Sequence, residues 1–181
     1  MKKAVLLGDS IRLIGYGGRC AELLAGEFET VAPDDNGRFV KYTLRMVLLE
    51  WKDMLTGADV IHWNNGLWDV CDLGDGPFSK LDEYIENLLR VQRALSNYSK
   101  NIIFATTTPT KNMWGHDLER TREYNKAAVQ ALAPLGVTIN DLYSTVAADI
   151  EGNICDDHIH LSPKGIELCA RQTADMIRSI S

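Results

Sequence analysis

The stretch KKAVLLGDS, residues 2–10, decides the fold. It has two lysines, a short apolar run from Ala4 to Leu7, and then Gly-Asp-Ser. A secretory signal needs about 7–15 apolar residues and a membrane helix about 18 or more, so this run predicts neither. A brief apolar run closed by Gly and Asp is typical of a buried β-strand. We therefore expect a first strand that ends at a Gly-Asp-Ser turn.

Four more runs of this kind predict strands, with the sequences FETVA, ADVIHW, NIIFATT and GVTIN, at residues 28–32, 58–63, 101–107 and 136–140. Apolar residues recur at helical spacing over residues 20–26, 44–56, 79–99, 116–133 and 163–180. Strand and helix in alternation predict a parallel sheet covered by helices on both faces. We expect a single α/β domain over residues 1–181. It should have three α/β/α layers and a flavodoxin-like five-stranded parallel sheet in the order 2-1-3-4-5.

Composition limits the classes of function. The 181 residues carry a formal net charge of −6, and 45% of them are apolar or aromatic. An acidic chain does not suit nucleic acid or an anionic membrane as its main partner, because both need clustered lysine and arginine. The cysteines have no metal-binding spacing, so we interpret them as reduced thiols of a cytoplasmic protein; they are Cys20, Cys71, Cys155 and Cys169.

The first candidate for chemistry is Ser10, which follows the first predicted strand almost directly. Ligands of open α/β sheets bind outside the carboxyl ends of the strands, so polar residues at those ends are the candidates. Alone, a Gly-Asp-Ser segment could equally be a turn in which Asp or Ser caps the next helix. A serine attacks well only when a base takes its proton, so the interpretation needs a histidine and an orienting acid.

The stretch ICDDHIHLSPKG, residues 154–165, supplies both groups. The spacing Asp157-x-x-His160 lets one turn bring the carboxylate beside the imidazole, whose other nitrogen would face the serine, as in a catalytic triad. Asp156 with His158 is the rival pair, although neighbouring side chains diverge. An acidic loop in solvent remains the alternative for the whole stretch.

Amides near the ends of two other strands could stabilise an oxyanion. The stretch HWNNGLWD, residues 62–69, contains Asn64 and Asn65, and alternation along a strand lets only one of them face the edge easily. After the second strand, Asn36-Gly37 suits a turn, yet the glycine amide there could be another donor.

A two-metal phosphoesterase is the competing chemistry, because His158-x-His160 and Asp9 resemble parts of its pattern. The first strand, however, carries no Asp-x-His, and the Asn-Asn segment lacks a histidine partner. We therefore expect no metal site.

Together these segments resemble the SGNH or GDSL hydrolases, a superfamily of serine esterases with a flavodoxin-like three-layer fold. GDS at residues 8–10 matches the family's first block, and Asp157-x-x-His160 followed by Leu-Ser is similar to its last block. The resemblance implies that Ser10 is the nucleophile, with its own amide in the oxyanion hole, and that Asp157 and His160 complete the triad. His158 then fills a position where the family usually has glycine.

The middle blocks depart from the family's usual pattern. Its third block usually reads Gly-x-Asn-Asp, but residues 66–69 read Gly-Leu-Trp-Asp. A variant branch that reads His-aromatic-Asn-x-Gly-Leu-x-Asp matches this sequence and implies Asn64 as the oxyanion donor, with Asn65 as the alternative. For the second block, the best match implies the Gly37 amide, while the family's usual spacing would land on Lys41.

The resemblance implies a serine esterase, without metal or cofactor, that hydrolyses carboxylic esters through an acyl-enzyme. The sequence has no long lid insertion, which suggests an open, shallow site for short acyl groups such as acetyl on a carbohydrate or another small molecule. The alternatives are a thioesterase or lysophospholipase of the same fold, or a non-catalytic carbohydrate-binding relative. We expect a small-molecule ester as partner, and neither nucleic acid nor a membrane.

Overall fold

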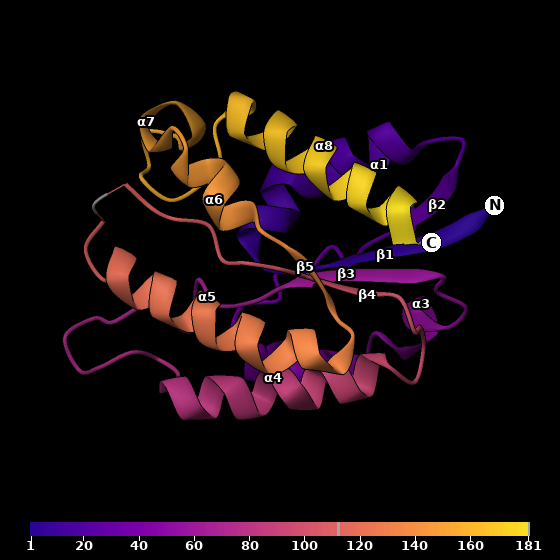
Figure 1. Ribbon diagram of the computed structural model, residues 1–181, viewed down its shortest axis with the longest axis horizontal. Coiled ribbons are helices and arrows are strands. Elements are labelled where there is room, and N and C mark those ends of the chain that lie inside the picture. Colours follow the sequence, from indigo (N-terminus) through magenta and orange to yellow (C-terminus); the bar gives the residue numbers. More distant parts are fainter. Residues whose placement is uncertain (112, 181) are drawn as a thin grey trace.

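The computed structural model describes residues 1–111 and 113–180. At its centre lies a parallel sheet of five strands in the order β2-β1-β3-β4-β5 (Figure 1). The strands are β1 (Lys2–Leu7), β2 (Phe28–Val31), β3 (Val60–Asn64), β4 (Ile102–Ala105) and β5 (Thr138–Asn140). The predicted fold class and strand order are confirmed.

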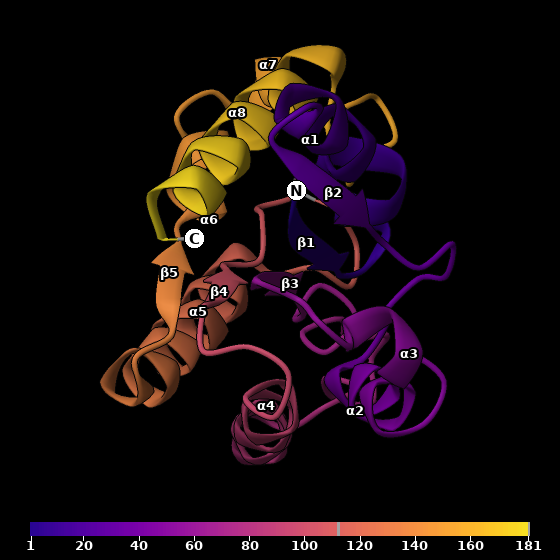
Figure 2. The ribbon, with the colours of Figure 1, turned by 90° about the vertical axis from the view of Figure 1, so that its right-hand side faces the viewer.

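Helices cover both faces of this sheet (Figure 2). One layer contains η1 (Ile11–Tyr16), α1 (Gly17–Leu24), α6 (Leu142–Ala147), α7 (Ile150–Asn153) and α8 (Pro163–Ile180). The other contains α2 (Val40–Leu48), α3 (Lys52–Leu55), α4 (Leu81–Leu95) and α5 (Leu118–Leu132), which ends in the short turn η2 (Ala133–Leu135). Within the two described stretches of chain, no helix combines the length and apolar content needed to span a membrane.

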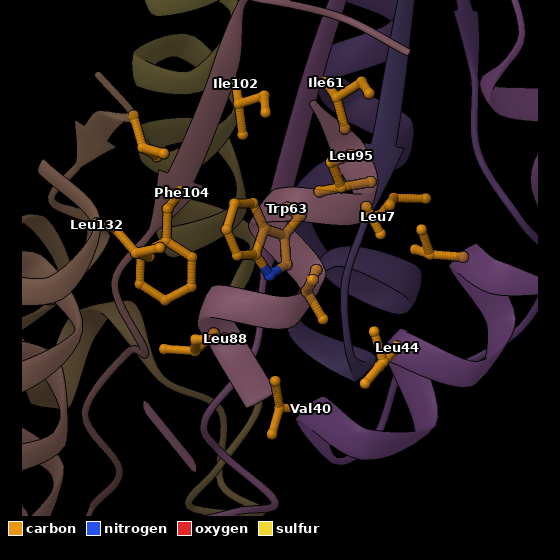
Figure 3. Close-up of a cluster of buried hydrophobic side chains, with 14 of the residues drawn as sticks. Leu7, Val40, Leu44, Ile61, Trp63, Leu88, Leu95, Ile102, Phe104 and Leu132 are labelled. Atoms are coloured by element: carbon orange, nitrogen blue, oxygen red, sulfur yellow. The ribbon is translucent and has the colours of Figure 1, made fainter. Parts of the chain in front are cut away.

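The central strands are buried on both faces, which is why their sequences are continuously apolar rather than alternating. In β1, Leu7 belongs to the cluster that includes residues of α2, α4 and α5, whereas Leu6 belongs to the cluster on the opposite face. Figure 3 shows the first cluster, in which the rings of Trp63 and Phe104 meet edge-on with centroids 4.9 Å apart. A hydrophobic core on each face therefore holds the sheet in place.

The three longest helices, α4, α5 and α8, lie within the predicted ranges 79–99, 116–133 and 163–180. The prediction of one helix over residues 44–56 is wrong: Leu49 leaves the helical region, with φ −126° and ψ −79°, and this splits the range into α2 and α3.

Two short helices, α6 and α7, escaped the sequence analysis. Both begin after an aspartate that caps them: the Asp141 carboxylate accepts from the Ser144 amide, and Asp149 accepts from the Gly152 amide. These Asp-x-x-Ser and Asp-x-x-Gly spacings are the signal that could have revealed them. These two helices position the stretch that begins at residue 154, because they carry the chain to it from the end of β5.

The parallel register brings the strand ends to one edge. Leu7 of β1 pairs with Trp63 of β3, and Asn64 pairs with Ala105 of β4. The residues that follow these strands are therefore close in space although they are far apart in the sequence. The predicted site residues lie along this edge.

Candidate active site

Ser10 is the third residue after the end of β1, at the start of the helical segment η1. The Asp9 carboxylate holds this turn by accepting from the Ile11 amide at 3.0 Å, and the Asp9 carbonyl accepts from the amides of Arg12 and Leu13. Amides at the start of a helix have no partner within the helix, so the Ser10 amide, at the N-cap of η1, makes no intrahelical bond.

Gly8 allows the close approach on which this turn depends. Its φ is +154°, and a Cβ added there would lie 1.9 Å from Oδ1 of Asn64. Its carbonyl accepts from the Gly37 amide at 2.8 Å and from the buried guanidinium of Arg12 at 3.3 Å. A larger residue at this position would push β3 away from the serine.

Ser10, His160 and Asp157 form one chain of hydrogen-bonding contacts. Nε2 of His160 lies 3.0 Å from Oγ of Ser10, and Nδ1 of His160 lies 2.7 Å from Oδ2 of Asp157. An imidazole whose Nδ1–H donates to the carboxylate keeps Nε2 free to accept from the serine hydroxyl. The structure thus joins residues that are 150 positions apart in the sequence.

The second oxygen of Asp157 fixes the carboxylate in place. Oδ1 accepts from the amide of Ile159 at 3.0 Å and from that of His160 at 2.9 Å. Burial alone would raise the pKa of Asp157, but these two amides and the His160 side chain outweigh it and lower the pKa to about 2. The carboxylate is therefore ionised at neutral pH, and its side chain is 49% exposed.

The loop around the histidine is shaped by backbone bonds. The Cys155 amide donates to the His160 carbonyl at 2.7 Å, and the Lys111 amide donates to the His158 carbonyl at 2.8 Å. His158 has φ +71°, in the left-handed region that favours glycine. This explains in backbone terms why the resembling family usually has glycine at this position.

The rival pair, Asp156 with His158, is not brought together at the serine. Nδ1 of His158 lies 3.2 Å from the Lys111 carbonyl, so this imidazole faces a different loop. Among the described residues, no group of three or more His, Cys, Asp or Glu side chains is arranged to hold a metal ion.

The expectation for Gly37 needs a correction. Its amide donates to the Gly8 carbonyl at 2.8 Å, and its carbonyl accepts from the Thr43 hydroxyl at 2.8 Å. The amide therefore holds the loop against Gly8 and the carbonyl holds it against α2, so the amide is not free for an oxyanion. The alternative, Lys41, lies in the first turn of α2, with its ammonium paired to Glu83.

The two asparagines after β3 have different surroundings. The Asn65 side-chain amide donates to the Arg38 carbonyl at 3.0 Å, so it ties two loops together. Oδ1 of Asn64 accepts from the buried Tyr16 hydroxyl at 3.2 Å, and the same oxygen lies against Gly8, where an added Cβ would be 1.9 Å from it. Asn64 is thus the asparagine beside the serine turn, oriented by Tyr16.

His62, two residues earlier, belongs to the core. It is fully buried, burial lowers its pKa to about 3, and Nε2 lies 3.1 Å from Nδ2 of Asn140. It is a neutral, hydrogen-bonded histidine.

A pocket of about 350 Å³ opens beside Ser10 and His160. Its remaining lining is almost entirely apolar: Leu67, Trp68, Cys71, Leu73, Phe78, His116 and Ile159. Trp68 and Phe78 each pack edge-on against Phe39, with ring centroids 5.3 Å away. The candidate nucleophile therefore lies beside an apolar pocket.

Sequence analysis missed most of these pocket residues. Leu73, Phe78 and His116 lie in the loops that follow β3 and β4, where no periodic pattern places a side chain. The available signal was the density of large apolar residues between positions 67 and 78, a stretch without strand or helix periodicity.

Comparison with known proteins finds similarity in structure rather than in sequence. No family model matches the chain, and no curated protein matches it by sequence. A lipase/acylhydrolase from Enterococcus faecalis superposes with TM-score 0.84 at 20% identity, over 99% of this chain and 96% of that one. A catalytic mutant of an acetylxylan esterase from Geobacillus stearothermophilus gives 0.81 at 20% identity, over 97% and 94%.

A member of the lipolytic G-D-S-L family from Veillonella parvula gives TM-score 0.78 at 18% identity, over 97% of each chain. The chain therefore has the fold of the GDSL or SGNH hydrolases over nearly its whole length, as the resemblance in its sequence implied.

Proposed function

We propose that this protein is a serine esterase that hydrolyses carboxylic esters through an acyl-enzyme. The observation that carries the proposal is the contact chain from Ser10 Oγ through His160 to Asp157, with separations of 3.0 and 2.7 Å. Its position at the carboxyl edge of the sheet, beside an apolar pocket, gives an ester a place to bind.

In the proposed reaction, Ser10 Oγ attacks the ester carbonyl carbon while Nε2 of His160 takes the hydroxyl proton. The imidazolium that forms is stabilised by Asp157 and then gives its proton to the departing alcohol. Water attacks the acyl-enzyme in the second half, with His160 again as base, and releases the carboxylic acid and free Ser10.

The developing oxyanion needs donors that are already in place. We propose the Ser10 amide and the side-chain amide of Asn64, because the first has no intrahelical partner and the second belongs to the carboxamide that packs on the serine turn at Gly8. Loss of one such donor typically costs about 3–4 kcal/mol of transition-state stabilisation. The Gly37 amide is left out of this proposal because it is bonded to Gly8.

For the substrate, we propose a short acyl group, such as acetyl, on a carbohydrate. The acetylxylan esterase among the similar structures supports this choice. An acetyl group is much smaller than the 350 Å³ pocket, so part of the alcohol must share that space. The apolar lining also favours a second candidate, a thioesterase or lysophospholipase that places a longer acyl chain there.

Chain length separates the two substrates. For a short-acyl esterase, kcat/KM on p-nitrophenyl esters should be highest for acetate and fall towards decanoate. A profile that rises with chain length would favour the thioesterase or lysophospholipase.

The nucleophile is tested by hydrolysis of p-nitrophenyl acetate together with the intact mass after treatment with a fluorophosphonate. Ser10→Ala should lower kcat roughly 10³–10⁶-fold and abolish the adduct. Ser179→Ala, at an exposed serine near the end of α8, is the matched control and should keep both. Wild type with neither activity nor adduct would instead favour the non-catalytic carbohydrate-binding relative.

We also propose a cytoplasmic location. Cys20, Cys71, Cys155 and Cys169 are all free in the structure, which suits a reducing compartment. Cell fractionation with an antibody tests this, and recovery of the protein outside the cytoplasm would contradict it.

A further inference from the structure

A second pocket, of about 380 Å³, lies next to the apolar one. The two share His116, and the segment between them contributes alternate residues to each: Cys71 and Leu73 to the apolar pocket, Asp72 and Gly74 to the second. One short stretch of chain therefore forms a wall of both pockets. A ligand held at Ser10 reaches the second pocket by passing this wall.

The second pocket differs in chemistry, because its lining is polar and holds one large exposed aromatic. Asp72, Asp117 and Arg120 supply charged groups, and the Trp114 side chain is 75% exposed. Tryptophan is a highly buried residue on average, yet among the described large apolar residues only Met1 is more exposed than Trp114. It offers a flat apolar platform facing solvent.

The polar groups are held in place before any ligand arrives. Oδ1 of Asp72 accepts from the amides of Gly74 and Gly76, and Oδ2 accepts from Arg120 at 3.2 Å. The Gly74 amide is the largest influence that lowers the pKa of Asp72, so its carboxylate remains an acceptor at neutral pH. Arg120 also donates to the Val70 carbonyl at 3.0 Å.

The loop that carries Trp114 is tied to both sides of the site. The Asp72 amide donates to the Gly115 carbonyl at 2.8 Å, which joins the loop after β4 to the loop after β3. The Lys111 amide donates to the His158 carbonyl at 2.8 Å, which joins it to the histidine loop. The loop that contributes Trp114 to the second pocket is therefore hydrogen-bonded to the loop that carries His160.

We propose that this second pocket, formed by Asp72, Trp114, Asp117 and Arg120, binds a sugar residue of the alcohol part of the substrate. The inference rests on the proposed esterase function, because it extends the same site. A pyranose has an apolar C–H face, which packs on an aromatic ring, and hydroxyls, which donate to carboxylates and accept from a guanidinium. A lipid surface fits less well, because Asp72 and Asp117 would repel anionic headgroups.

The first test measures sugar binding in the Ser10→Ala protein, where hydrolysis cannot interfere. Xylobiose is titrated by calorimetry into Ser10→Ala, Ser10→Ala/Trp114→Ala and Ser10→Ala/Leu135→Ala. Leu135 is the control because it is an exposed apolar side chain at the end of α5, near the opposite edge of the sheet. We expect Trp114→Ala to weaken binding about tenfold, as for truncation of an aromatic anchor, and Leu135→Ala to leave it unchanged.

The second test compares two substrates of the active enzyme. The ratio of kcat/KM on acetylated xylobiose to kcat/KM on p-nitrophenyl acetate should fall at least about fivefold in Trp114→Ala but not in Leu135→Ala. Equal xylobiose binding with and without Trp114 would overturn the sugar site. So would a loss confined to p-nitrophenyl decanoate, which would place an acyl chain there. If wild type hydrolyses no ester, the esterase proposal fails while the calorimetry still decides the sugar site.

Discussion

The serine segment and the histidine loop meet at one contact, yet they are built in opposite ways. Beneath the serine, Asp9 and Asp69 are fully buried, and burial raises the pKa of each. In the histidine loop, Asp157 is half-exposed and backbone amides lower its pKa. The difference teaches that burial of a carboxylate does not mark it as catalytic. Asp157, which we propose as the acid that stabilises a transient imidazolium, is the solvated one and is already ionised.

The largest effect is expected from a change of Asp157, the exposed carboxylate of the two regions compared. Asp157→Asn removes the charge that orients and stabilises the His160 imidazolium, so kcat on p-nitrophenyl acetate should fall roughly 10²–10⁴-fold. The melting temperature should change little because the side chain is 49% exposed. Asp156→Asn is the matched control on the adjacent exposed aspartate. If it proved as damaging as Asp157→Asn, the assignment of the acid would be wrong.

The buried carboxyl of Asp69 is tested through the pH dependence of the free energy of unfolding. Asp69 accepts from the Val40 amide and the Ser79 hydroxyl, and burial is the main cause that raises its pKa from 3.8 to about 7. A carboxyl whose pKa is higher in the folded chain adds stability that is complete below its unfolded pKa. That stability is lost as the pH rises towards its folded pKa.

Asp69→Asn keeps an acceptor oxygen but cannot ionise, so it should remove this loss. Between pH 4 and pH 7, wild type should lose on the order of 4 kcal/mol of unfolding free energy relative to the variant. Urea unfolding at several pH values measures the difference. A gap between the two proteins that stays constant with pH would show that burial does not control this carboxyl.

A smaller effect, on stability, is expected at His158, where the resembling family usually has glycine. His158 has φ +71°, so His158→Gly should relieve backbone strain while His158→Ala should not. Both variants lose the contact with the Lys111 carbonyl, and the difference between them isolates the backbone term. The glycine variant should be more stable than the alanine variant by about 1–2 kcal/mol in urea unfolding. Equal stability would mean that the loop relaxes freely.

The smallest expected effect concerns the side chain that orients Asn64. Tyr16→Phe removes the hydroxyl that donates to Asn64 Oδ1 at 3.2 Å. Because the bond acts through the proposed oxyanion donor, kcat should fall about two- to tenfold with KM nearly unchanged, the size of one buried hydrogen bond. A rise in KM at constant kcat would instead point to a role in ground-state binding.

Much of the fold was predictable because parallel strands and long amphipathic helices leave periodic patterns. Continuous apolar runs such as that of β1 are required when both faces of a strand are buried. Periodicity did not predict the helix boundaries that depend on local backbone geometry. The split at Leu49 and the capped helices α6 and α7 depend on a few backbone angles and on single aspartates.

For the candidate site, the sequence by itself determined which residues could form a serine–histidine–aspartate set, because the required types occur in short, well-spaced segments after strands. It also ranked Asp157 above Asp156 by spacing. Only the tertiary structure decided that the Gly37 amide is hydrogen-bonded to the Gly8 carbonyl and that Asn64 rather than Asn65 lies beside the serine turn. It also decided that Trp68, Phe78 and His116 line one pocket. The reason is physical: spacing along a chain limits which neighbours can meet. The partner of an amide, or the wall of a cavity, depends on loops that come together only when the sheet and both helix layers have packed.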